Sequence, residues 1–262
     1  MKFRIIAIIL ILPLFVVAQD GWIPYRSPEG GFKIMTKGIF KERLAHAKTD
    51  IGEITVHNLV YQKEEKGKTL LITGANGGLG RVVTQTALLQ GAQVVLLDLL
   101  FASEELEAGV LAKHAVDLTD AAATKACIDG IAQFDGVINL AGGFAMGPTV
   151  VDTSDEEWQA MFTINVTTLR SMIAATIPRL QTSGSGCMVN VGAYGALSGQ
   201  ANMNAYCAAK GTVMKLTESL SEEVKADGIN VNAVLPTIID TPANRNDMPD
   251  ATFSDWVSPA AL

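Results

Sequence analysis

The hydrophobic pattern of the chain changes character near Lys66. Residues 68–73 (KTLLIT) and 93–97 (QVVLL) are short apolar runs, which are typical of strands buried in a parallel sheet. Between them lie a glycine-rich turn and an amphipathic segment that predicts a helix ending near Gln90. This order of strand, turn, helix and strand indicates a β–α–β unit.

The same alternation continues toward the end of the chain. Residues 155–180 place apolar side chains on one helical face, and residues 187–191 form another short apolar run. Residues 204–225 then predict a second long helix. We therefore predict that residues 66–262 form one α/β domain with a Rossmann-type, doubly wound parallel sheet.

Two segments of different character precede this domain. Residues 1–18 carry two basic side chains and then an apolar run, which predicts a secretory signal peptide. A membrane anchor is the alternative, but the run is shorter than the ~20 residues that a bilayer span needs. Residues 19–65 space aromatic side chains among glycine, proline and charges, which predicts a short β-rich appendage.

Composition narrows the classes of function. The 262 residues are 48% hydrophobic and 18% charged, so the chain has enough apolar side chains for a full core. A net charge of −7 argues against nucleic acid or an anionic membrane as a partner. The cysteines, Cys127, Cys187 and Cys207, lack metal-ligand spacing and are predicted to be reduced and mostly buried. Two of the three histidines lie in the first quarter, which argues against a histidine-dependent hydrolase and a zinc site; we predict no metal.

The turn after the first strand carries the main chemical signal. Gly74, Gly78 and Gly80 let the backbone bend sharply and approach a pyrophosphate, whose charge would face a helix N-terminus. Asp98 ends the second strand, where a carboxylate accepts hydrogen bonds from an adenosine ribose and repels a 2′-phosphate. The glycine turn holds no basic residue, and Arg81 comes just after it. This pattern favours NAD(H) over NADP(H) as the cofactor.

The segment TGANGGLG resembles the TGxxxGxG pattern of the short-chain dehydrogenase/reductase family, and the resemblance runs from about residue 66 to the end. Leu140 stands where the family's Asn-Asn-Ala-Gly segment has its second Asn, which weakens one hydrogen-bonding role. The resemblance implies a set of cofactor contacts along the domain: Gly74, Asn76, Gly78, Leu79, Gly80, Asp98, Asp117, Leu118, Asn139, Ala141, Gly142, Tyr206, Lys210, Pro236 and Thr241.

Tyr206 and Lys210 are the predicted catalytic pair. Their i, i+4 spacing places them on one face of a helix, where the charge of Lys210 is expected to lower the pKa of Tyr206. The resemblance adds that Lys210 binds the nicotinamide ribose and that Asn165 is the helix asparagine holding a water in a proton relay. An exposed polar residue is the alternative for Asn165.

The family's catalytic serine is missing from this chain. It would lie 13 residues before Tyr206, and Ala193 occupies that position. Tyr194 and Ser198 are nearby hydroxyls, but neither has the right register. Because ordinary carbonyl reduction builds negative charge on oxygen, losing one preorganised donor is expected to cost ~10²–10³ in rate.

The dihydropteridine reductase branch of the family is similar in this respect. Its members have the Tyr/Lys pair, an alanine-type residue in place of the serine and a preference for NADH, and their quinonoid dihydropterin substrate is a conjugated acceptor that needs no localised alkoxide. Residues 139–144, ending in Phe144, resemble its Ala-Gly-Gly-aromatic loop, where an aromatic could stack on a pterin. Residues 235–256, with Pro236-Thr237 instead of Pro-Gly, resemble its substrate lid.

Three alternatives stay open at this point. The chain could be a general short-chain carbonyl reductase acting on another small molecule, a non-catalytic NAD(H)-binding remnant, or a secreted binding module centred on residues 19–64. The resemblance implies a homodimer or homotetramer built on the two long helices.

The reductase domain is expected in the cytoplasm, in conflict with the leader, so we suspect two unrelated segments joined near residues 62–67; an exported fusion is the alternative. Family members continue past the lid with a helix and a last strand, so we expect the domain to be incomplete and its sheet to end on an open edge.

Overall fold

The computed structural model describes the strands at 23–26, 33–36, 40–49 and 52–61 and residues 67–103 and 105–261. The chain divides into two units, Met1–Glu64 and Glu65–Leu262. The predicted signal peptide, residues 1–18, lies outside the described residues.

The first unit consists of two antiparallel strand pairs. β1 (Ile23–Arg26) pairs with β2 (Lys33–Thr36), and β3 (Phe40–Thr49) pairs with β4 (Gly52–Tyr61). The predicted β-rich character is therefore present in the described part of this unit.

The second unit is built on a six-stranded parallel sheet, which confirms the predicted fold class. In spatial order its strands are β10 (Ile229–Val234), β9 (Gly186–Val191), β8 (Gly136–Asn139), β5 (Thr69–Thr73), β6 (Gln93–Asp98) and β7 (Val110–Ala115). The chain first moves outward from β5 to β7 and then crosses to β8, so the strand order reverses between β5 and β8. Within this sheet β10 pairs with β9 alone.

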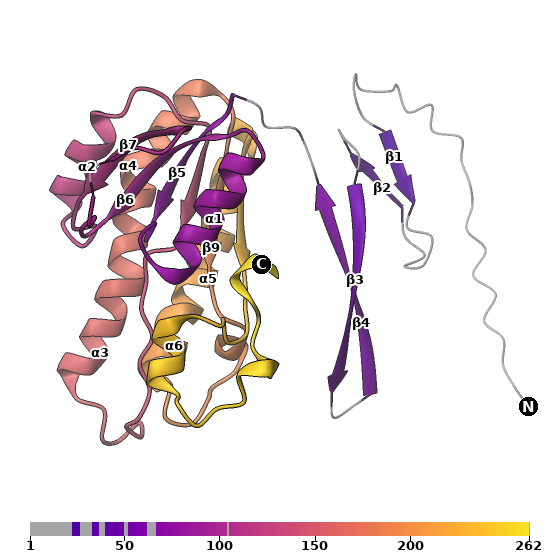
Figure 1. The fold of residues 1–262 in the computed structure, drawn as a ribbon, viewed down its shortest axis with the longest axis vertical. Helices are drawn as coiled ribbons and strands as arrows, with labels where there is room; N and C mark the ends of the chain where they lie inside the picture. The colour runs from indigo at the N-terminus through magenta and orange to yellow at the C-terminus, as the bar shows by residue number, and fades with distance from the viewer. Residues whose placement is uncertain are drawn as a thin grey trace, which may run out of the picture. The chain divides into compact units, whose positions relative to one another are not determined.

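Helices cover both faces of the sheet, as Figure 1 shows. Leu71 and Val95 pack in one core cluster with side chains of α2, α4 and α5, whereas Ile72 and Val94 pack with α1 on the other face. This two-sided burial explains the continuous apolar runs in the sequence. The helices are α1 (Gly78–Leu89), α2 (Ala121–Asp129), α3 (Asp155–Phe162), α4 (Thr168–Ser183), α5 (Asn204–Val224) and α6 (Pro242–Asp247). Short helical turns are η1 (Thr163–Thr167), η2 (Tyr194–Leu197), η3 (Lys225–Asp227), η4 (Phe253–Asp255) and η5 (Pro259–Ala261).

The helix predicted over 155–180 is interrupted. A capping box between Ser154 and Glu157 starts α3, a π-helical turn follows at η1, and α4 continues to a left-handed Gly184. Extra residues of this kind inside helices are frequent at functional sites. The whole run Asp155–Ser183 is long and apolar enough to cross a membrane, but half of its most apolar window is buried inside the unit, as in a core helix.

The predicted burial of the cysteines is only partly right. Cys207 is buried on α5, Cys127 is half-buried and Cys187 is exposed. Cys187 lies on β9 opposite Gly136, and a Cβ at Gly136 would meet the Cys187 sulfur at 2.6 Å, so the thiol occupies the space that the glycine leaves free.

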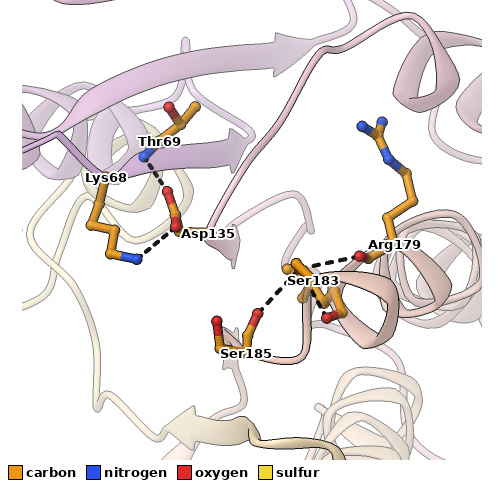
Figure 2. Close-up of polar contacts among 7 residues, drawn as sticks. Lys68, Thr69, Asp135, Arg179, Ser183 and Ser185 are labelled. Atoms are coloured by element: carbon orange, nitrogen blue, oxygen red, sulfur yellow. Dashed lines mark hydrogen bonds and ion pairs between the residues drawn. The ribbon is translucent and has the colours of Figure 1, made fainter.

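Side chains pin the amino ends of the two central strands. Asp135, just before β8, accepts hydrogen bonds from the backbone amide of Thr69 at 2.9 Å and from the Lys68 ammonium at 2.7 Å. Figure 2 shows these contacts together with Ser183, whose hydroxyl donates to the carbonyls of Arg179 and Ser185 beside the start of β9. The register of β5 against β8 is thus set at one end of the sheet, away from the chemistry at the other end.

Candidate active site

A cleft opens at the carboxyl ends of β5 and β8, where the strand order reverses. Its volume is about 580 Å³. Such a reversal is where open α/β sheets bind their ligands. Seven of the predicted contacts line it: Gly74, Asn76, Asp98, Asp117, Leu118, Ala141 and Gly142. Seven lining residues were not predicted: Gly77, Leu99, Val116, Thr119, Leu140, Ile164 and Thr168.

The glycine turn leaves no room for side chains at two of its positions. Gly74 has a φ of +62°, and a Cβ there would lie 2.9 Å from the backbone nitrogen of Ala141. A Cβ at Gly80 would lie 2.1 Å from the Gly74 carbonyl oxygen. Glycine is required at both positions because the start of α1 packs directly on the turn.

Thr73 holds the far side of the cleft in place. Its fully buried hydroxyl accepts hydrogen bonds from the amides of Leu140 and Ala141, both at 3.1 Å. The turn after β5 and the loop after β8 are thereby tied together. Asn139, predicted as a cofactor contact, does not face this cleft, because its amide lies inside the sheet and donates to Asn190 at 2.8 Å.

Asp98 organises the glycine turn as well as lining the cleft. Its carboxylate accepts from the backbone amides of Asn76 at 2.8 Å and Leu99 at 2.7 Å. Arg81 donates to the carbonyl and the side-chain oxygen of Asn76, both at 2.9 Å. Asp98 and Arg81 therefore both hydrogen-bond to Asn76 at the edge of the cleft.

The segment after β10 reaches the glycine turn. A Cβ at Gly78 would lie 3.1 Å from the Thr241 methyl group, so Thr241 packs against the turn. The hydroxyl of Thr241 also accepts from the amide of Asn244 and starts α6. Pro236 lies further back, where its carbonyl accepts from the Tyr194 amide at 3.0 Å.

Tyr206 and Lys210 lie on α5, and both are largely removed from water. Burial raises the pKa of Tyr206 to about 12, with a smaller contribution from the charge of Cys207. Burial also lowers the pKa of Lys210 to about 8. The Lys210 ammonium donates to the Val191 carbonyl at 2.9 Å.

The expected lowering of the Tyr206 pKa by Lys210 is therefore wrong for this protein. Desolvation of the phenol raises its pKa, and the Lys210 ammonium is itself hydrogen-bonded to the Val191 carbonyl. A phenol with a raised pKa stays protonated at neutral pH and is suited to donating a proton.

Asn165 is buried within the π-helical turn η1, so the alternative of an exposed residue is wrong. Its side chain donates to the Gly143 carbonyl at 3.0 Å and accepts from the Gly143 amide at 3.2 Å. A Cβ at Gly142 would lie 2.7 Å from the Asn165 oxygen and 3.4 Å from the Lys210 nitrogen. Asn165, Lys210 and the loop after β8 therefore converge on one point.

The residue at position 193 is a buried alanine that precedes η2, which packs on α5. The two nearby hydroxyl groups, on Tyr194 and Ser198, are exposed. Phe144, at the end of the loop after β8, meets Tyr206 edge to face with ring centroids 5.0 Å apart. The phenol is thus flanked by an aromatic ring instead of a second hydroxyl.

These features fit a dinucleotide. The turn at Gly74–Gly80 offers backbone amides at the N-terminus of α1 to a pyrophosphate, and Asp98 offers acceptors to a ribose. Tyr206 and Lys210 are not among the residues that line the cleft, but the Lys210 nitrogen approaches Gly142, which does line it. In the part of the chain that the structure describes, no group of three histidine, cysteine or acidic side chains could hold a metal ion.

Comparison with known proteins decides the family. The family model for short chain dehydrogenases matches residues 68–252. The chain belongs to this family. The matched range includes the glycine turn, Asn165, Tyr206 and Lys210.

The relatives differ in what their names say they act on. The chain is 31% identical over 199 residues to sorbitol dehydrogenase of Cereibacter sphaeroides, covering 72% of this chain and 77% of that protein. A solved structure of 3-ketoacyl-(acyl-carrier-protein) reductase from Brucella melitensis, complexed with NADH, superposes with a TM-score of 0.67 at 26% identity over 74% of this chain and 87% of that one. ElxO with NADP bound, at 22% identity, has a TM-score of 0.69 over 74% and 87% of the two chains and shares the fold.

Replacing Lys210 by methionine is expected to stabilise the second unit at pH 7 while disabling the site. A pKa lowered from 10.5 to about 8 corresponds to a burial cost of about 3 kcal/mol below pH 8. Above pH 8 the folded protein loses the proton before the unfolded chain does, so the wild type gains stability and the advantage of Lys210→Met shrinks. Urea unfolding between pH 7 and 10 measures this trend.

Lys215→Met is the matched control for that measurement. Lys215 is on the same helix, but its side chain is 78% exposed and pairs with Glu218. The Lys215→Met substitution should change the free energy of unfolding by less than about 0.5 kcal/mol at both pH 7 and pH 10. Equal effects of the two substitutions would contradict the buried charge of Lys210.

Proposed function

We propose that this chain is an NADH-dependent reductase of a conjugated, electron-poor acceptor, such as a quinonoid dihydropterin, with Tyr206 as proton donor. The observation that carries the proposal is that a buried alanine, Ala193, precedes the turn η2 that packs on α5, the helix of the protonated Tyr206. A plain ketone develops a localised alkoxide and benefits from a second hydroxyl donor, whereas a conjugated acceptor spreads the charge over its ring system.

The side chains of the site divide the work. A bound nicotinamide supplies the hydride. Tyr206 holds a proton on its phenolic oxygen and donates it to the substrate atom that becomes negative. Lys210, charged below pH 8, favours negative charge on that phenolic oxygen after the transfer and binds the ribose. Asn165 keeps the loop after β8 closed on Lys210 through its two bonds to Gly143.

The surroundings of Tyr206 support a flat substrate. Phe144 presents its ring at 81° to the phenol, which leaves an aromatic surface beside the proton donor. A planar heteroaromatic ring gains from stacking on such a surface, by about 1 kcal/mol beyond the burial of its area. A small aliphatic ketone gains less from it.

The preference for NADH rests on Asp98. A carboxylate at the end of β6 accepts from ribose hydroxyls and repels a 2′-phosphate. Both of its oxygens already accept backbone amides, which fixes its position without exhausting its lone pairs. Arg81 is engaged with Asn76, which reduces its availability for a phosphate.

A general alcohol or carbonyl oxidoreductase is the second candidate. The name of the relative from Cereibacter sphaeroides, a sorbitol dehydrogenase, favours it. In that case another donor replaces the hydroxyl missing at Ala193.

Turnover by the full chain separates the two. NADH oxidation should be fast with a quinonoid dihydropterin and at least ~10²-fold slower with a simple ketone. Tyr206→Phe should lower the pterin rate about 10²-fold or more while NADH binding, followed by fluorescence, is retained. Tyr194→Phe is the control, because this exposed tyrosine lies outside the proton path. Equal rates with ketone would favour the second candidate, and NADH binding without turnover would leave a cofactor-binding protein.

Restoring the missing hydroxyl tests the role of position 193. Ala193→Ser should raise the rate with a simple ketone about 10-fold or more, since it adds a donor at the developing alkoxide, and should change the pterin rate little. The ratio of the two kcat/KM values is the measurement. An unchanged ratio in a folded variant would contradict our interpretation of Ala193.

A further inference from the structure

A chain of buried polar side chains crosses the second unit next to the catalytic helix. Asn139 on β8 donates to the side-chain oxygen of Asn190 on β9 at 2.8 Å. The Asn190 amide donates to the Thr217 hydroxyl on α5 at 2.9 Å, and that hydroxyl donates to the Val213 carbonyl at 2.8 Å. The three polar side chains belong to buried residues.

This series of hydrogen-bonded side chains connects β9 and α5, the same two elements that hold Lys210. Asn190 directly precedes Val191, whose carbonyl accepts the Lys210 ammonium at 2.9 Å. Thr217 follows Lys210 by seven residues on α5, so the two side chains lie on the same helical face, with Val213 between them. Strand β9 and helix α5 are therefore joined twice, by an amide–hydroxyl bond and by an ammonium–carbonyl bond.

Apolar side chains could have filled these positions at lower cost. Apolar contacts surround them: Leu220 and Val224 of α5 are buried in the same core cluster as Met188 of β9. Among the described residues, the side-chain oxygen of Asn139 has no hydrogen-bond partner, which makes the polar chain expensive. Buried polar groups held at such a cost restrict a core to one arrangement, because any slip leaves further groups unpaired.

We propose that Asn139, Asn190 and Thr217 are positioning residues that fix the place of the Lys210 ammonium by locking the register of α5 on β9. The significance of that place rests on the role of Lys210 in the proposed function. Without the lock, α5 can shift along β9 on its apolar side chains alone, and the ammonium loses the Val191 carbonyl.

The surroundings of Lys210 make this shift measurable. The groups that the structure places around it are neutral at pH 7: the Val191 carbonyl, the Gly142 backbone, the Asn165 amide and the Tyr206 phenol on its own helix. Burial already holds its pKa at about 8. Losing the carbonyl, which binds the charged ammonium more strongly than the neutral amine, lowers that pKa further.

The test uses Thr217→Val, which keeps the shape of the side chain and removes the hydroxyl. The Lys210 titration is followed in the full chain without nucleotide by NMR of ¹³C-labelled lysine, with Lys210→Met assigning the signal. The midpoint should fall by roughly 1 pH unit, since a hydrogen bond to a charged group is lost. Thr217→Ser, which retains the hydroxyl, should restore the wild-type midpoint.

Thr176→Val is the matched control. Thr176 is fully buried on α4, and its hydroxyl donates to the Met172 carbonyl four residues earlier, as Thr217 does to Val213. This substitution should cost similar stability and leave the Lys210 midpoint unchanged. Thr217→Ala serves in place of Thr217→Val if the latter does not fold.

An unchanged or raised Lys210 midpoint in a folded Thr217 variant would overturn the positioning role, whatever the turnover. The proposed function is judged by a different result. If the Thr217 variant shifts the Lys210 midpoint but the wild type does not reduce the pterin, the positioning role is supported and the pterin is refuted as the substrate. Where the wild type is active, kcat in Thr217→Val should fall about 10-fold relative to Thr176→Val, through the displaced ammonium.

Discussion

The Thr73 hydroxyl, by accepting the amides of Leu140 and Ala141, sets the geometry on which the site depends. It joins the ends of β5 and β8 at the one place where the strand order reverses. Asp135 makes the corresponding connection at the other end of the same strand pair. With both ends held, the glycine turn packs against the loop after β8 at Ala141, and both segments line the cleft.

Two polar side chains of helix α5 lower the stability of the folded protein. Lys210 is a buried ammonium with a lowered pKa, and Tyr206 is a half-buried phenol with a raised one. The ammonium keeps one fixed dipole in the core, the Val191 carbonyl, in exchange for its hydration. Active sites generally carry such costs, since preorganised polar groups that suit a reaction rarely suit the resting fold.

Much of this could be predicted from residue patterns. The glycines at 74 and 80, Asp98 and the Tyr206–Lys210 spacing are local in sequence, so their placement follows from strand and helix periodicity. The pKa of Tyr206 could not be predicted in the same way, because it depends on burial by distant segments. Leu99, Ile164 and Thr168 were missed for a related reason: apolar and hydroxyl side chains lining a cleft look like ordinary helix and loop residues in sequence. The bond between Asn139 and Asn190 could not be predicted either, because the two residues lie 51 positions apart in the sequence.

A crystal structure of the full chain with NADH tests the central claim most directly, namely that the glycine turn and the Tyr206–Lys210 pair serve one nucleotide. We predict the pyrophosphate against Gly74–Gly80 and the nicotinamide ribose within hydrogen-bonding distance of the Lys210 ammonium, with the ring beside Tyr206. A nucleotide that binds the turn but leaves Lys210 and Tyr206 without contact would contradict the account and would leave the buried pair on α5 without a catalytic explanation.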